Sequence, residues 1–421
     1  MTVLATVLAV TQVDTGPRIA TVRQAPGESG STLPLGAQTP TPTPTLPAEV
    51  TDPEARSAAI ARLLLDRGEA IRRDDAATWR RQQVAAATTP DFANLAVLPI
   101  TRWTYTVDST TSGDDATQVT LGAVVTYRLD VDERDAVLRE QLVLQHTDTG
   151  WRVASERGEG GRAQPWDLGK LAVVRGRSSL VIGIGTSTAT LRRYAAVADS
   201  VAEEVTAVWG EDWSGSPVIV VPSTTALLAR GLGRSVASLE RIAAVTTSEG
   251  GNTAARGTRA ADRVWTNTPV MTSLSVLGRE IVIRHETLHA AVGAAATNAT
   301  PLWLEEGLAE YVGYRGSGVS LRTAAGDLIT AVRAGRGPRK LPTPEDFGGA
   351  RLAEAYESAH VACVALAEKY GVPALVEVYR LTAAGDGDAA DNLDAALREV
   401  TGQGTSSLTA LWSARLRGLV G

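Results

Sequence analysis

Two of the chain's four histidines lie one helical turn apart, in the stretch IVIRHETLHA at residues 281–290. Residues four apart point the same way from a helix, so His285 and His289 can bind one metal ion together. Glu286 is turned around the helix, where it can act on a water without ligating the metal. This arrangement is the physical basis of the H-E-x-x-H motif, which here reads HETLH. Imidazole ligands favour Zn2+, although cobalt, manganese or nickel can substitute.

A third ligand must distinguish a metal site from two histidines that merely share a helix face. Catalytic zinc keeps three protein ligands and one open position. The variant with a third histidine, H-x-x-G-x-x-H, is excluded because Val292 and Ala295 occupy its positions, and Met271 precedes the motif, so that no methionine turn comes after it. The stretch PLWLEEGLAEY at residues 301–311 instead predicts a second helix, with acids at positions 305, 306 and 310.

The pair HETLH and WLEEGLAEY resembles the gluzincins, metallopeptidases whose third ligand is glutamate. Within them it is most similar to the peptidase MA-like domains, distantly related to the aminopeptidase-N and thermolysin groups. The resemblance covers about residues 165–421. It implies that Glu306, which precedes the glycine, joins His285 and His289 on zinc, and that Glu305 occupies the variable position. It also implies peptide-bond hydrolysis by metal-activated water, with Glu286 as the general base.

Three further residues are candidates for the same site. An acid at Glu310, one turn after Glu306, can accept the second N–H of a ligating histidine, as an aspartate does in thermolysin-like gluzincins; a surface acid is the alternative. Tyr356 is similar to the tyrosine that donates a hydrogen bond to the oxyanion in aminopeptidase-N-like enzymes, although Ala359 replaces the usual glycine. An ordinary half-buried tyrosine is the competing interpretation, and His360 is an alternative donor.

The elements around these motifs predict an α+β protein of two units behind a linker. Residues 1–48 carry no hydrophobic period and end in a Pro/Thr-rich, extended segment. Residues 49–163 begin with a helical pattern over 54–87 and continue as strand-like runs, which predicts a helix on a curved antiparallel sheet. This order resembles the cone-shaped nuclear-transport-factor-like fold. Inside such a cone the sequence offers only His146 and scattered acids, which favours a binding or structural role.

Residues 164–421 form the second predicted unit, a zincin-type domain with a small sheet and a mostly helical C-terminal half. Residues 246–262 are expected to form a Gly-rich loop. The run RVWTNTP just after it is interpreted as the edge strand that pairs with an extended substrate. Every candidate ligand, base and donor lies after residue 280, so the chemistry is expected wholly within this unit.

Composition narrows the function class and the compartment. The net charge is −6 without a basic stripe, which excludes a nucleic-acid partner. The single cysteine, Cys363, excludes a disulfide framework. MTVLATVLAV is too short to span a bilayer and is either the remnant of a signal anchor or an inert end. Together with the linker it suggests an exported or membrane-anchored protein of a bacterial cell envelope, with a cytoplasmic location left open.

The predicted substrate is therefore a peptide or protein. No G-x-M-E-N-type motif, which grips a substrate amine in aminopeptidase-N-like enzymes, precedes His285. This favours an endopeptidase. One alternative is a zinc-binding protein with weak or no activity, whose cone binds a ligand or partner. Another is an isomerase-like cone, which would need a buried acid and a hydrogen-bond donor facing one pocket.

Overall fold

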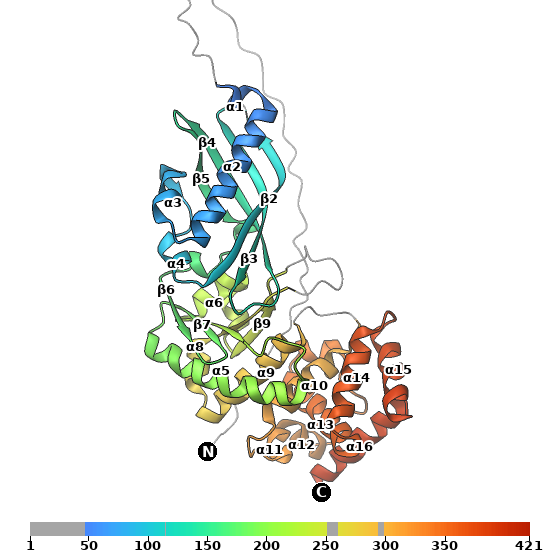
Figure 1. Ribbon diagram of the computed structural model, residues 1–421. Helices are drawn as coiled ribbons and strands as arrows, with labels where there is room; N and C mark the ends of the chain where they lie inside the picture. Colours follow the sequence, from blue (N-terminus) through green and yellow to red (C-terminus); the bar gives the residue numbers. More distant parts are fainter. Residues whose placement is uncertain (1–46, 114, 251–259, 294–298) are drawn as a thin grey trace, which may run out of the picture.

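The computed structural model describes residues 47–113, 115–250, 260–293 and 299–421, and in them the chain forms two five-stranded sheets and a helical C-terminal half (Figure 1). This mixture confirms the predicted α+β fold class. The linker prediction for residues 1–48 falls almost wholly outside the described residues. The unit boundaries at 49–163 and 164–421 stay a prediction.

The first unit packs helices against a sheet with strand order β1-β5-β4-β3-β2, in which β2 to β5 are antiparallel. Its strands are β1 (Gln83–Thr88), β2 (Ile100–Ser112), β3 (Gln118–Leu129), β4 (Ala136–Thr147) and β5 (Gly150–Gly158). Its helices are α1 (Ala48–Thr51), α2 (Pro53–Arg72), α3 (Ala76–Arg81) and α4 (Phe92–Ala96). The side chain of Asp52 caps α2 by accepting from the Glu54 N–H. Helix α2 then buries Ile60 and Leu64 against the strands.

The prediction of a single helix over residues 54–87 is wrong. Helix α2 ends at Arg72, and Asp74 takes a left-handed φ of 55°, which aspartate tolerates better than most residues. Asp75 then caps the short α3 by accepting from the Thr78 N–H. Residues Gln83–Thr88 form β1, which pairs in parallel with β5. Pairing with the sheet edge overrides the helical preference of the local sequence, because strand formation depends on context more than helix formation does.

The interior of the first unit contains a polar cluster that the sequence interpretation missed. The buried Arg67 guanidinium bonds the Glu156 carboxylate, with Nε to Oε2 at 2.9 Å, and lies 3.3 Å from the Trp79 ring centroid. The Tyr105 hydroxyl donates to the other oxygen of Glu156 at 2.6 Å. His146 lies elsewhere, 3.6 Å from Glu49. Both oxygens of Glu156 are thus paired within the cluster, which favours a structural role for this carboxylate over that of a catalytic base.

The second sheet has the strand order β6-β7-β8-β10-β9. Its strands are β6 (Leu171–Arg175), β7 (Leu180–Ile184), β8 (Val218–Pro222), β9 (Ala244–Ser248) and β10 (Asp262–Thr266). Strands β7, β8 and β10 are parallel, and β6 and β9 run antiparallel to their neighbours. The interpretation of RVWTNTP as the edge strand is therefore wrong, because β10 is interior. The edge on this side of the sheet is β9, whose last residues lie in the segment predicted as a loop over 246–262.

Two helices cover one face of this sheet, namely α5 (Thr188–Trp209) and α9 (Val276–Val292). The remaining helices are α6 (Thr225–Leu232), α7 (Val236–Leu239), α8 (Thr268–Ser273), α10 (Leu302–Tyr314), α11 (Leu321–Ala324), α12 (Gly326–Arg333), α13 (Leu352–Tyr370), α14 (Val372–Ala384), α15 (Ala389–Thr401) and α16 (Thr405–Val420). The prediction of a helical C-terminal half is thus confirmed, and α10 to α16 gather beside the sheet in Figure 1.

The two units share one hydrophobic core across the predicted boundary. The Trp166 ring lies 5.3 Å from the Trp103 ring and 5.5 Å from the Tyr127 ring, centroid to centroid. The buried side chain of Asn94 donates to the Trp166 carbonyl at 3.0 Å and accepts from the Leu171 N–H at 2.9 Å. Because these groups are buried between the units, we expect the first unit to contribute to the stability of the second.

A buried ion pair also joins the units, and it gives a test of their coupling. Arg263 on β10 contacts Asp132, in the turn between β3 and β4, through two bonds of 2.7 Å, and both side chains are 4% exposed. Asp132→Asn should lower the free energy of unfolding by about 3 kcal/mol, because an unpaired buried charge is costly. Urea denaturation followed by fluorescence would measure this change.

The matched control lies in the same turn. Asp130 pairs with Arg175, but their side chains are 38% and 49% exposed. Asp130→Asn should therefore cost less than about 1 kcal/mol. Two separate unfolding transitions in the wild type, or equal effects of the two substitutions, would contradict the coupling of the units through this contact.

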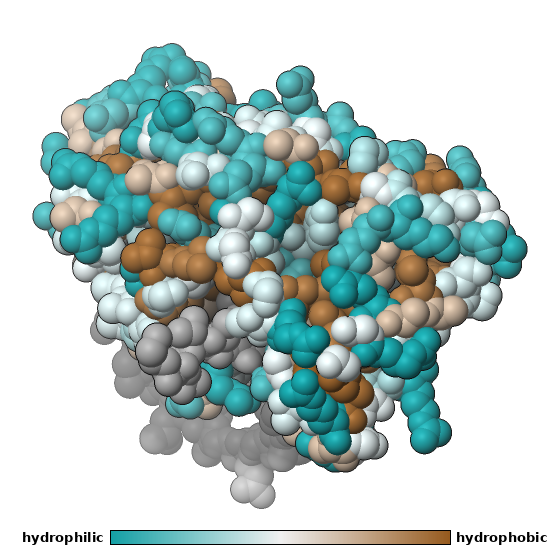
Figure 2. Space-filling model, turned by 90° about the horizontal axis from the view of Figure 1, so that it is seen from below, coloured by the Kyte–Doolittle hydropathy of each residue, from teal (hydrophilic) through white to brown (hydrophobic). Residues whose placement is uncertain are grey.

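The surface is mixed in character. Figure 2 shows hydrophilic side chains interspersed with apolar ones on the face seen from below. Across the described ranges, no helix combines the length and the apolar character that crossing a bilayer requires.

Candidate metal centre

The HETLH stretch lies in the second half of α9, which is buried on several sides. Ser275 caps this helix by accepting from the Gly278 N–H at 3.0 Å. The helix packs on β9 and β10 with one side and on α5 and α10 with others. His285, Glu286 and His289 are 1%, 1% and 7% exposed. Polar side chains that are buried to this extent require polar partners. The neighbouring helix α10 supplies one of them, Glu306.

Helix α10 carries the second motif and approaches α13 closely at Gly307. A Cβ atom built on this glycine would lie 2.7 Å from the Ala359 carbonyl oxygen and 2.8 Å from Cys363 Sγ. Only a glycine therefore fits at this crossing. Gly307 lets the backbone next to Glu306 pack directly against α13. This contact sets the position of the Glu306 carboxylate relative to the neighbouring helices. Cys363 is buried in this contact, as the sequence predicted.

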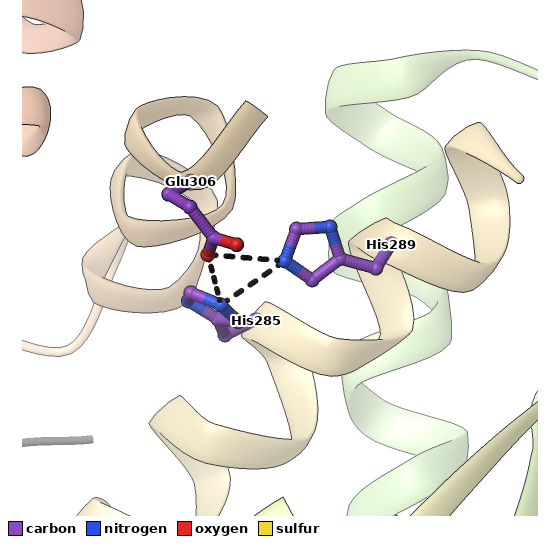
Figure 3. Close-up of side chains that lie close together, drawn as sticks. All are labelled: His285, His289 and Glu306. Atoms are coloured by element: carbon purple, nitrogen blue, oxygen red, sulfur yellow. Dashed lines mark hydrogen bonds and ion pairs between the residues drawn. The ribbon is translucent and has the colours of Figure 1, made fainter. Parts of the chain in front are cut away.

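The donor atoms of His285, His289 and Glu306 converge on one point (Figure 3). The two Nε2 atoms lie 3.2 Å apart, and Glu306 Oε2 lies 3.4 Å from each of them. Tetrahedral zinc with bonds of about 2.0–2.2 Å would place neighbouring ligand atoms about 3.3–3.6 Å apart. The three donors thus have the chemical type and the spacing of a tetrahedral site with one open position.

An outer carboxylate orients the first histidine. Glu310 Oε1 lies 3.1 Å from His285 Nδ1, the ring nitrogen that points away from His289 and Glu306. The structure thereby places Glu310 where the sequence suggested, in contact with the second nitrogen of a ligating histidine. Such a contact selects the tautomer that leaves Nε2 free to bind a metal.

The electrostatics of the cluster are those of a cation site. Burial lowers the pKa of His285, but Glu306 and Glu310 outweigh burial and raise it to about 10. Burial raises the pKa of Glu306, but His289 and His285 outweigh it and lower the value to about 2. The carboxylates thus stabilise positive charge between the rings. Metal ligands must be deprotonated. A metal ion bound between the rings would therefore replace the extra proton that the raised pKa of His285 favours.

Glu286 lies beside the cluster without belonging to it. Its Oε2 accepts a hydrogen bond of 2.6 Å from the Thr246 hydroxyl on β9. Its Oε1 is buried and has no hydrogen-bond partner among the described residues. One oxygen of this carboxylate is therefore available to a water or a substrate. Thr246 was missed by the sequence interpretation, because it lies in the segment predicted as a loop.

Tyr356 lies next to His285, and His360 lies one turn further along α13. The Tyr356 ring centroid is 6.4 Å from that of His285, and burial, with the charges of Glu306 and Glu310, raises the tyrosine pKa well above its usual value. The hydroxyl therefore keeps its proton and can donate. His360 stacks on Tyr314 at 5.1 Å, and burial lowers its pKa to about 4. Of the two candidates, Tyr356 is the one whose ring lies beside that of His285.

Similarities to known proteins give little further information about this site. The sequence matches no family model and no curated protein. Among solved structures, the chain is similar to a two-domain M1 zinc metallopeptidase, a mutant bound to L-arginine, at 14% sequence identity and a TM-score of 0.34. The match covers 76% of this chain and 61% of that one, so this chain spans less than two thirds of its length. A likeness of this degree does not carry the chemistry across.

Proposed function

We propose that the protein is a zinc-dependent peptidase that hydrolyses peptide bonds. The observation that carries the proposal is the spacing of three donor atoms. His285 Nε2, His289 Nε2 and Glu306 Oε2 lie 3.2–3.4 Å apart, close to the edges of a tetrahedron around zinc. The unbonded Oε1 of Glu286 next to them supports hydrolysis rather than a purely structural metal.

The residues divide the chemistry among them. Zinc bound by His285, His289 and Glu306 would supply a Lewis acid that activates water and polarises the substrate carbonyl. Glu286 takes the proton of the attacking water through Oε1 and passes it to the leaving amine. Tyr356 donates its hydroxyl proton in a hydrogen bond to the carbonyl oxygen as negative charge develops there. Peptide hydrolysis by this route needs no covalent intermediate.

The edge strand β9 supports an extended peptide as the substrate. It lies at one edge of the second sheet and, together with β10, packs on α9, the helix that carries HETLH. An extended peptide can add to such an edge through its backbone, which gives affinity without reading the peptide's terminus. This arrangement, together with the lack of an amine-gripping motif before His285, supports an endopeptidase.

The test is a digest of a synthetic peptide library by the purified full-length chain with added zinc. Half of the library carries N-acetylated ends, and a chelated sample is the control. Cleavage inside acetylated peptides that disappears with the chelator is the expected result. Release of single residues from free amino ends alone would make the protein an aminopeptidase. Stoichiometric zinc without cleavage would favour the alternative of an inactive zinc-binding protein.

A further inference from the structure

Thr246 places a hydroxyl on the face of β9 that packs against α9. It lies in β9 and is 5% exposed. Ala244 lies on the same strand, and Val264 is the cross-strand partner of Thr246. Both pack with Val282 and Ile283 of α9. Burying a hydroxyl without a partner costs about 1–3 kcal/mol in proteins. A threonine at this position therefore needs a specific acceptor on α9.

That acceptor is the Glu286 carboxylate. Thr246 Oγ1 lies 2.6 Å from Glu286 Oε2 and 3.0 Å from the backbone carbonyl oxygen of the same residue. A hydroxyl has one proton to donate, and the shorter distance assigns it to the carboxylate. Hydrogen bonds to an ionised acceptor are shorter and stronger than neutral ones. Strand β9 thus holds one oxygen of Glu286 in place.

The second oxygen is left open by this contact. Glu286 Oε1 is buried and, within the described part of the chain, accepts no hydrogen bond. Fixing Oε2 also fixes the plane of the carboxylate, and so the direction of Oε1. We infer that Thr246 is a positioning residue for the general base: it anchors Oε2 of Glu286 so that Oε1 faces the attacking water. This inference rests on the proposed function.

Two substitutions at Thr246 separate the hydroxyl from the shape of the side chain. Thr246→Val replaces the hydroxyl with a methyl group of similar size, and Thr246→Ser keeps the hydroxyl. On a peptide that the zinc-loaded wild type cleaves, Thr246→Val should lower kcat about 10–100-fold, the range for losing an outer hydrogen-bond partner. KM and zinc content should stay unchanged, and Thr246→Ser should restore most of kcat.

A matched control is a buried threonine on the next strand. The Thr266 hydroxyl donates to the Val220 carbonyl oxygen at 3.3 Å, and the residue is fully buried. Thr266→Val removes a hydroxyl of similar burial and should leave kcat unchanged. A fall in kcat of the same size in this control would mean that Thr246 acts only through the stability of the sheet.

Crystal structures of the zinc-loaded wild type and Thr246→Val provide a readout that needs no activity. In the variant, the Glu286 side chain should occupy more than one rotamer. A single unchanged rotamer, or wild-type kcat in a fully zinc-loaded Thr246→Val protein, overturns the inference. An inactive wild type counts against the proposed function instead, and the crystallographic comparison then decides the role of Thr246.

Discussion

Glu286→Gln should keep its zinc and lose about 10²–10⁴-fold in kcat/KM, the range that a general base contributes. Glutamine has the shape of glutamate, and its amide oxygen can still accept from Thr246, now 2.6 Å from Oε2. The ligand-bearing helix should therefore be undisturbed, while the proton acceptor is lost. Peptide kinetics together with zinc content by elemental mass spectrometry measures both quantities on one sample.

The control for this substitution lies on the same helix. Glu280 is half-buried near the start of α9, five residues before His285 in the sequence. Glu280→Gln should keep both zinc and turnover. Unchanged turnover in Glu286→Gln would refute the assigned base. Loss of zinc from that variant would instead make Glu286 a contributor to metal binding.

The pair of histidines on α9 could be predicted because the spacing is local. A helix places positions four apart on one face, so the formation of α9 is enough to bring the side chains of His285 and His289 together. Glu306 was predicted from the resemblance of WLEEGLAEY to a family motif. Neither the pattern nor the resemblance specified how close the carboxylate would come. That distance depends on the crossing at Gly307, where the backbone of α10 meets α13.

Contacts that are distant in the sequence explain why other features could not be predicted. Thr246 meets Glu286 across 40 positions, and Arg67 meets Glu156 across 89. Strand β9 is short and is followed by glycines. Its alternation of apolar and polar residues is too short to distinguish it from a loop. The residues Gln83–Thr88 favour a helix locally and become β1 only by pairing with β5. In each case the deciding partner lies in another element.

The boundary between the units illustrates the same limit. Composition and pattern separate residues 49–163 from 164–421, but they do not reveal which side chains are buried between them. Trp166 packs on Trp103 and Tyr127, and Arg263 pairs with Asp132, so side chains from both units complete one core. We therefore expect the first unit to stabilise β10, and with it the sheet under α9, although none of its described residues belongs to the cluster of His285, His289 and Glu306.

Loss of any one ligand should remove most of the bound zinc. His289→Ala or Glu306→Ala leaves two protein donors, one fewer than a catalytic zinc site requires. The zinc affinity should fall by more than the factor of about 10–100 that is typical of losing a residue that contacts a metal ligand. Glu310→Gln, which weakens the contact of 3.1 Å to His285 Nδ1, should fall within that smaller range. Competition with a coloured chelator would rank the variants.

Glu305 supplies the matched control, because it is an acid next to Glu306 on the same helix. It is half-buried, and burial together with the charge of Glu306 raises its pKa to about 8. It also lies outside the cluster of donor atoms formed by the two histidines and Glu306. Glu305→Ala should therefore retain wild-type zinc affinity while Glu306→Ala loses it. Stoichiometric zinc in His289→Ala, or equal losses in Glu305→Ala and Glu306→Ala, would show that the metal binds elsewhere.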